Sequence, residues 1–250
     1  MLLDISKKIL SGIAAGLLIS IGCAVFLACE NRYVGSVMFS VALLSICLFG
    51  VALYTGKIGF MLQNHGREDF SVLLLGLLGN TLGVAAGGFA LSYAIPKLKT
   101  AAVTLCEAKL ADQAWGQTLL RGLFCGILMY VAVCVFRRCG KVIGILFCIP
   151  VFILSGFEHS IADIGYFACA NIISWDAFLF IWTVILGNSL GSLLISALTT
   201  AALDAPNAKK TAADNTAAAQ AAVTVAENAA KSAETTAESA ADSKTDEAAK

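Results

Sequence analysis

The chain has 250 residues, of which 58% are hydrophobic and only 14% are charged, and its mean hydropathy is +0.82. Soluble domains carry about a quarter charged residues, and a membrane-crossing helix needs about 20 consecutive apolar residues. Because such stretches recur along the chain, the composition excludes an ordinary soluble domain and predicts an all-α, multi-pass membrane protein. With a net charge of zero, the chain has no basic excess, and we expect no nucleic-acid partner.

The zero net charge combines two unlike regions. Residues 1–203 are net positive, whereas residues 204–250 are net negative, lack aromatic residues and consist mostly of Ala, Thr, Ser, Glu, Asp and Lys. A segment of that composition cannot bury a core. We therefore expect a transmembrane channel domain over 1–203 and an Ala-rich charged tail over 204–250, disordered or loosely helical.

Six spans are predicted in chain order: about 9–29, 36–63, 71–95, 118–137, 142–168 and 177–200. The first follows MLLDISKKIL, which has no small-residue cleavage site and is typical of a retained helix and not of a signal peptide. The second span is interrupted at LYTGK, residues 53–57, and the fifth at SGFEHS, residues 155–160.

The distribution of basic residues predicts the orientation. An even number of spans places both termini on one side, and basic residues favour the cytoplasmic side. With the termini inside, the inner loops carry Lys7, Lys8, Arg67, Arg137, Arg138 and Lys141, and the outer loops carry Arg32, Lys97, Lys99 and Lys109. We expect a plasma- or inner-membrane protein with both termini in the cytoplasm.

An internal repeat divides the chain into halves. LLGNTLG at 77–83 returns as ILGNSLG at 185–191, and the glycine pair of SGIAAG returns in RGLFCG. LYTGK aligns with FEHSI, which matches Thr55 with His159. Three matches in the same order indicate two halves of three spans each, and an odd number of spans inverts the second half. Inverted repeats with interrupted helices point to a transport site near the membrane midplane.

Each interruption is expected to start a new half-helix. Ser160-Ile-Ala-Asp163 has the form of a capping box, and Thr55 is placed to cap the half-helix after the first interruption. Two helix N-termini then bring partial positive charge toward the protein centre. This arrangement favours an anion.

Two ionisable groups at the second interruption, Glu158 and His159, need separate interpretations. We expect Glu158 to accept backbone N–H groups and so support the broken segment, since intramembrane acids usually pair locally. His159 either fills space or acts in the pore, where its unperturbed pKa of about 6.5 lets its charge change at working pH. Sequence neighbours such as Glu158, His159 and Ser160 do not point at one another as a catalytic triad requires, so we expect no enzyme. His65 is most simply a surface histidine.

The nine cysteines form no CxxC pair, and most lie in apolar runs. Buried free cysteine behaves as a small hydrophobe, and the spacing does not resemble a metal or disulfide framework. We expect neither a metal site nor a cofactor.

GFEHSIADIGYF at 156–167 resembles the signature of the formate/nitrite transporter family, GFEHS followed by a small or apolar pair and Asn. Further likenesses follow in the family's order: AGLLISIG in the first span, LYTG at the first interruption, LLGNTLG, RGLFCGIL and ILGNSLG. The resemblance implies an aquaporin-like fold and a homopentamer with one pore per protomer. It also implies small monovalent anions as substrates: formate, nitrite, hydrosulfide and, in some members, acetate or lactate.

The resemblance assigns pore positions residue by residue. The central histidine of the family corresponds to His159, and the threonine of its loop corresponds to Thr55, flanked by Leu53 and Tyr54. Two constrictions correspond to Phe39 and Phe152, which would otherwise count as ordinary packing residues. A lysine ahead of the fourth span corresponds to Lys109. Glu158, Ser160 and Asp163 are expected to support the second interruption.

Three positions depart from the family pattern. Gly126 stands where the fourth span usually has Asn, Asp163 stands where Asn usually follows GFEHS, and Lys57 places a cation two residues after Thr55. Lys57 either extends outward to the membrane interface or lines the pore. These departures leave the particular anion open.

The sequence thus predicts a channel or transporter for small monovalent anions, either passive or coupled to protons through His159. One alternative is a neutral-solute pore of the aquaporin type, but such pores use paired Asn-Pro-Ala loops that both interruptions lack. Another is a membrane-anchored interaction protein that acts through its tail.

Overall fold

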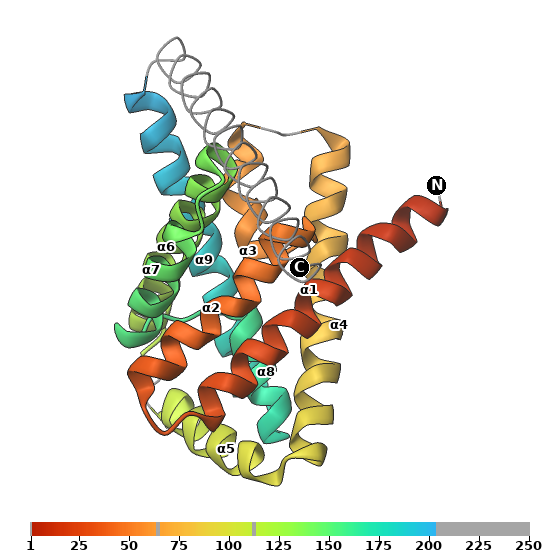
Figure 1. The fold of residues 1–250 in the computed structure, drawn as a ribbon, viewed down its shortest axis with the longest axis vertical. Helices are drawn as coiled ribbons and strands as arrows, with labels where there is room; N and C mark the ends of the chain where they lie inside the picture. The colour runs from red at the N-terminus through yellow and green to blue at the C-terminus, as the bar shows by residue number, and fades with distance from the viewer. Residues whose placement is uncertain (1, 64–65, 112–113, 204–250) are drawn as a thin grey trace, which may run out of the picture. The chain divides into compact units, whose positions relative to one another are not determined.

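The computed structural model describes residues 2–63, 66–111 and 114–203 (Figure 1). The predicted tail over 204–250 and His65 lie outside the described residues. The elements are α1 (Leu2–Ala28), α2 (Arg32–Phe49), α3 (Tyr54–Lys57), the 3₁₀ helix η1 (Ile58–Leu62), α4 (Arg67–Ala94), α5 (Pro96–Ala111), α6 (Trp115–Cys139), α7 (Ile143–Leu154), α8 (Ser160–Ala170) and α9 (Trp175–Ala202).

The helices make six membrane crossings. Among the described residues, α1, α2, α4, α6 and α9 are long and apolar enough to span a membrane, and α7 and α8 are shorter apolar helices. α2 followed by α3 and η1 forms the second crossing, and α7 followed by α8 forms the fifth. The prediction of six transmembrane segments in two inverted halves, with the second and fifth interrupted, is confirmed.

Glycines with positive φ end the helix before each interruption. Gly50 follows α2 with φ of 68°, and its N–H donates to the Cys47 and Ile46 carbonyls. Gly156 follows α7 with φ of 73°. Glycine adopts this left-handed conformation without the steric cost of a Cβ. In each half, the segment after this glycine runs extended for a few residues before α3 or α8 begins.

Glycines also allow two helix pairs to pack at backbone distance. A Cβ at Gly79 of α4 would lie 2.8 Å from Gly12 Cα of α1. In the second half, a Cβ at Gly187 of α9 would lie 3.0 Å from Gly122 Cα of α6. Small residues permit such close packing between membrane helices, and the repeated glycine motifs therefore mark the two close contacts.

One helix was missed by the sequence analysis, which treats the segment between the third and fourth spans as a loop. Figure 1 shows α5 at the lower end of the view, and it packs against α8. Pro96 is its first residue, a position that needs no backbone N–H donor. Leu98, Ala102 and Cys106 recur every fourth residue and are buried, and Lys109 continues that face. This helix therefore carries Lys109 toward α8.

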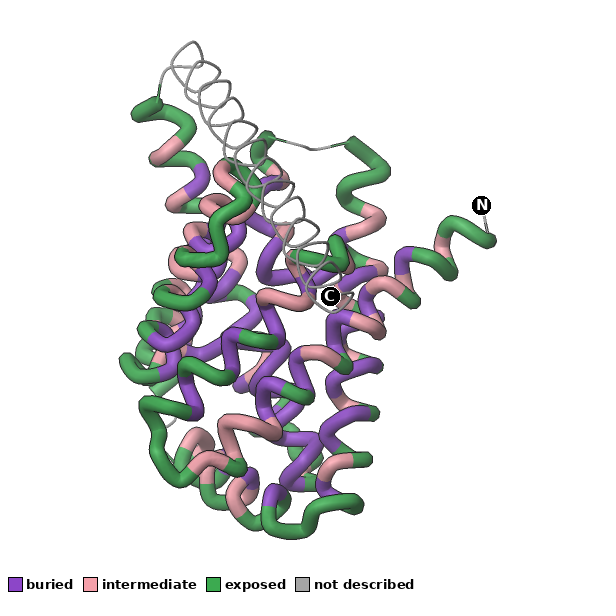
Figure 2. Tube along the Cα trace, in the orientation of Figure 1, coloured by how far each residue is buried: buried purple, intermediate pink, exposed green. Residues whose placement is uncertain are grey.

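Burial follows the pattern of a membrane protein. Figure 2 shows buried residues through the middle of α1, α2, α4 and α8. The buried set includes polar residues, among them Thr55, Asn80, His159 and Asn188, whereas many large apolar side chains are exposed. Lipid solvates apolar side chains and leaves polar groups to find partners inside the protein.

Candidate functional site

A hydrogen bond joins the two interruptions. Thr55 Oγ1 lies 2.9 Å from His159 Nε2, and both side chains are buried. The other ring nitrogen, His159 Nδ1, accepts the backbone N–H of Ala162 at 3.1 Å. A neutral imidazole carries hydrogen on one nitrogen only. Since Nδ1 is an acceptor here, Nε2 carries the hydrogen and donates it to Thr55.

The N-caps differ from the predicted ones. His159 caps α8, so the expected capping box that starts at Ser160 is wrong. Ser160 is the first helical residue, and its hydroxyl has no hydrogen-bond partner among the described residues. Leu53 precedes α3 and makes no side-chain cap bond, so Thr55 does not cap α3 either. Leu53 is therefore the positional equivalent of His159, a shift of two residues from the predicted alignment.

The two half-helices differ in length. α8 has 11 residues and directs its N-terminus at His159, which agrees with the expected positive dipole end. α3 has only four residues and continues as the 3₁₀ helix η1. Because a macrodipole is a sum over aligned peptide units, the positive end at α3 is weaker than the one at α8.

Asn80 and Asn188 hold the extended segments in place, a role that the sequence analysis missed. The Asn80 side chain bonds to Tyr54 N and the Ala52 carbonyl. The Asn188 side chain bonds to Ser160 N and the Glu158 carbonyl. The signal was present in the sequence, because each is a single amide within an apolar repeat motif, and buried amides are retained where backbone groups need partners.

An aromatic stack borders the histidine. Phe39 of α2 and Phe152 of α7 meet edge to face, with ring centroids 6.3 Å apart. Phe152 in turn stacks on the His159 ring at 5.8 Å. Both phenylalanines are buried. The structure therefore places Phe152 against His159 and Phe39 against Phe152.

Two cavities flank this centre. The large cavity, about 380 Å³, is lined by residues that include Leu53, Lys57, Phe60 and Arg137. The small cavity, about 70 Å³, is lined by residues that include Arg32, Lys109, Phe152 and His159. Leu53 thus borders one cavity while Phe152 and His159 border the other.

Tyr54 lines neither cavity. Its hydroxyl lies 2.8 Å from Ser189 Oγ of α9, and its N–H is bound by Asn80. This position ties α3 to α9 instead of exposing the ring to the cavities, so Tyr54 acts on the site through the placement of α3.

A buried ionic cluster lies on the small-cavity side. Lys109 Nζ pairs with Glu158 and, at 3.1 Å, with Asp163 Oδ1. All three side chains are largely buried, and Asp163 Oδ2 has no hydrogen-bond partner among the described residues. A buried charge is stable only when it is paired, so α5 and α8 are linked through this cluster.

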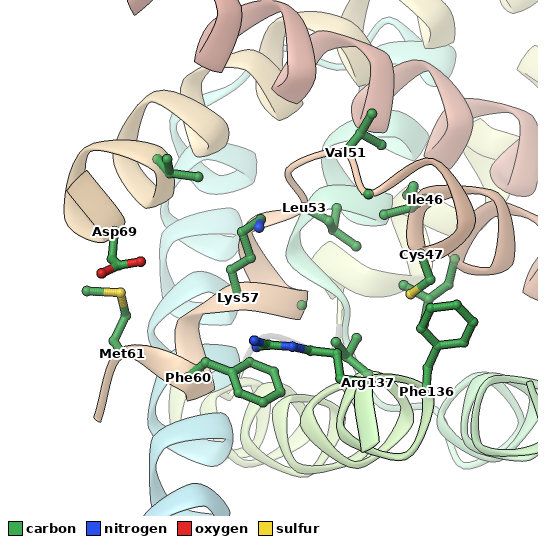
Figure 3. A pocket seen from close by; sticks show the side chains of 15 residues that line it. Ile46, Cys47, Val51, Leu53, Lys57, Phe60, Met61, Asp69, Phe136 and Arg137 are labelled. Atoms are coloured by element: carbon green, nitrogen blue, oxygen red, sulfur yellow. The ribbon is translucent and has the colours of Figure 1, made fainter. Parts of the chain in front are cut away.

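The two remaining departures from the family pattern have different positions. Lys57 lines the large cavity (Figure 3). Gly126 packs against the backbone of Asn188, and its carbonyl accepts the Ser192 hydroxyl at 2.8 Å. A side chain such as Asn has no space at this position, which explains glycine there.

The fold and site define a class. A helical membrane protein with two interrupted helices, which meet at a buried polar pair between two cavities, has the construction of a channel or transporter. The chain belongs to the formate/nitrite transporter family, whose model, described as "Formate/nitrite transporter", matches residues 1–202.

Individual relatives agree with this assignment. The chain is similar to "Formate-nitrite transporter 2" of Toxoplasma gondii, with 30% identity over 187 residues. That match covers 66% of this chain, and the chain spans about 40% of the relative's length.

Two solved structures resemble the chain. One is described as "FNT family ion channel" (TM-score 0.66, 22% identity, 79% of this chain and 88% of that one covered). The other is "Pentameric formate channel with formate bound" (TM-score 0.64, 21% identity, 78% and 95% covered). At these identities the likeness shows the shared fold.

Proposed function

We propose that the chain conducts small monovalent anions of the formate, nitrite or hydrosulfide class, or their conjugate acids, past His159. The observation that carries this proposal is the Thr55–His159 hydrogen bond, made where two interrupted helices meet between two cavities. Phe39 and Phe152 are the proposed constrictions on the path.

Desolvation is the physical problem that such a path must overcome. Moving an anion from water into a dry constriction costs several kcal/mol of solvation free energy, even after the protein relaxes around it. His159 donates its Nε2 hydrogen to Thr55 and thereby leaves the Thr55 hydroxyl hydrogen for a solute. A relay from Nε2–H through the Thr55 hydroxyl gives an anion a strong hydrogen bond. Transfer of a proton along the same path requires a histidine that has first gained a second proton on Nδ1, because a neutral ring that gave up its Nε2 hydrogen would be left as imidazolate.

The cap bond favours a neutral histidine as the resting donor. A proton on His159 Nδ1 faces the Ala162 N–H, 3.1 Å away, and two donors facing each other repel. Protonation therefore weakens the cap of α8, which couples the charge of the ring to the start of the helix. We infer that the hydrogen bond from Nε2 acts first and that full proton transfer, where it occurs, uses the same nitrogen.

We base the proposed setting of the channel on its family and on its basic loops. One structural relative is described as a pentameric formate channel with formate bound, and we propose a homopentamer and a formate-like substrate here as well. The basic loops support a plasma- or inner-membrane location with cytoplasmic termini. We propose transport without an enzymatic step.

The test is flux into proteoliposomes, measured by light scattering with formate, nitrite and hydrosulfide over a pH series. His159→Asn keeps a polar side chain but removes the titratable nitrogen, so the pH dependence should flatten while the protein still assembles. His65→Asn, which changes the only other histidine, is the matched control. An unchanged pH dependence in His159→Asn would refute the relay, and wild-type liposomes without anion flux would refute the function.

A further inference from the structure

The large cavity contains two cationic side chains from different helices. Lys57 comes from α3 and Arg137 from α6 (Figure 3). The Arg137 guanidinium carbon lies 4.1 Å from the centre of the Phe60 ring. Within residues 2–63, 66–111 and 114–203, Lys57 makes no side-chain hydrogen bond or ion pair. A cation without a partner that lines a cavity is available to a ligand.

Charge distinguishes the two cavities. The large cavity has Lys57 and Arg137 against one carboxylate, Asp69, so its lining is net positive. Asp69 is already engaged, because its Oδ2 accepts the Gly66 N–H at the start of α4.

The small cavity is balanced. It has Arg32 and Lys109 against Glu158 and Asp163. Lys109 is paired with those two carboxylates, and Arg32 Nη2 donates to the Ile153 carbonyl at 3.1 Å. An anion therefore meets a net positive lining in the large cavity and a balanced lining in the small cavity.

The shape and walls of the large cavity indicate the class of anion. Its volume of about 380 Å³ lies within the range of small-molecule sites, which is more space than a three-atom anion needs. Apart from the charged groups, the walls are mainly apolar and include Leu53, Phe60 and Val133. A carboxylate accepts a guanidinium fork in its own plane and an ammonium from the side, while a short hydrocarbon chain contacts the apolar walls.

We propose that Lys57 and Arg137 form a binding site for small monocarboxylates with a short apolar chain, such as propionate, at the entrance bordered by Leu53. This entrance lies on the side of the α1 N-terminus, since Lys8 pairs with Glu68 beside the cavity residue Asp69. The role of this site in transport rests on the proposed function. Binding at the site, however, is measurable without anion flux.

The experiment is equilibrium binding of radiolabelled propionate and formate to purified full-length protein. Lys57→Met and Arg137→Gln each remove a charge-assisted hydrogen bond and should raise the half-saturating propionate concentration roughly tenfold or more. Asp69→Asn keeps the cap of α4 but removes the opposing charge, so binding should tighten. Lys97→Met, an exposed lysine of α5, is the matched control and should bind as wild type. Added KCl should weaken binding by screening.

Lys57→Arg keeps the positive charge and should still bind propionate. If Lys57→Met folds poorly, this variant and Asp69→Asn test the site instead. Equal propionate binding in wild type, Lys57→Met and Asp69→Asn would overturn the site, as would no binding to wild type. Binding that depends on Lys57 in a protein without anion flux refutes the proposed function and leaves the site standing. Anion flux together with propionate binding that does not depend on Lys57 refutes the site and leaves the proposed function standing.

Discussion

Asn80 and Asn188 make the same three hydrogen bonds in the two halves of the chain. Asn80 Nδ2 donates to the carbonyls of Gly12 and Ala52, at 2.9 and 2.7 Å, and its Oδ1 accepts Tyr54 N–H at 2.8 Å. Asn188 Nδ2 donates to the carbonyls of Gly122 and Glu158, both at 2.8 Å, and its Oδ1 accepts Ser160 N–H at 2.9 Å. Each amide thus links an intact helix to an interruption and supplies partners to the backbone groups of the interruption, which no helix satisfies.

Replacing Asn80 or Asn188 with Ala should be strongly destabilising. Each change leaves one carbonyl and one N–H of the interruption buried without a partner, at about 1–3 kcal/mol for each unsatisfied group. We expect a lower thermal unfolding midpoint for Asn80→Ala and Asn188→Ala in detergent, and similar losses in the two variants. Gln117→Ala, which truncates an exposed amide of α6, is the control. A wild-type midpoint in either asparagine variant would contradict the assigned role.

The close contact between α6 and α9 predicts a sharp difference between two glycines. A Cβ at Gly191 meets the Leu123 carbonyl, whereas a Cβ at Gly116 meets nothing within 4 Å. Gly191→Ala should therefore separate the helices and lower the unfolding midpoint.

Gly116→Ala, its matched control, should leave the midpoint unchanged or raise it by the equivalent of about 0.4–1 kcal/mol, because it restricts the unfolded chain. Equal unfolding midpoints in Gly191→Ala and Gly116→Ala would show that α6 and α9 can move apart without loss of stability, which contradicts the prediction.

The spans, the repeat and the interruptions were predictable because each leaves a local trace in the sequence. Hydropathy marks the spans, and the glycines of the repeat motifs lie where helices touch. The helix α5 was missed because its buried face consists of only three residues, Leu98, Ala102 and Cys106. An apolar stripe that short does not separate a helix from a loop.

The N-caps could not be predicted for a different reason. His159 and Ser160 are adjacent and both carry a hydrogen-bond acceptor, so the choice depends on the backbone angles after Gly156. The meeting of Thr55 with His159, which are far apart in sequence, depends on the packing of both halves. Likewise, Lys109 reaches Glu158 and Asp163 only because α5 is a helix.

The phenylalanine pair predicts two distinguishable changes in flux. Phe39→Ala should widen the path and admit larger anions, seen as a higher ratio of propionate to formate flux, with the pH dependence retained. Phe152→Ala should admit larger anions and also change the pH dependence, since Phe152 stacks on His159.

Phe147→Ala, which truncates an exposed ring of α7, is the control for the phenylalanine variants. Unchanged selectivity in both Phe39→Ala and Phe152→Ala would show that the two rings only fill space.

The ionic cluster predicts the direction of two stability changes. Lys109 is the partner of both Glu158 and Asp163. Lys109→Met keeps the length of the side chain but leaves two buried carboxylates unpaired, and loss of one partner of a buried pair costs about 3–5 kcal/mol. We expect a markedly lower unfolding midpoint and a low yield. Lys97→Met, on the exposed surface of the same helix, should behave as wild type.

Asp163→Asn should act in the opposite direction. The change keeps an oxygen that accepts from Lys109 while it removes one of the two negative charges, and it replaces Asp163 Oδ2, which has no partner among the described residues. The cluster then pairs one cation with one anion, so the unfolding midpoint should stay at wild type or rise. In the double variant Lys109→Met/Asp163→Asn, only Glu158 remains unpaired, and part of the loss should be recovered. The four midpoints form a double-mutant cycle, and strictly additive effects of the two substitutions would show that Lys109 and Asp163 do not interact.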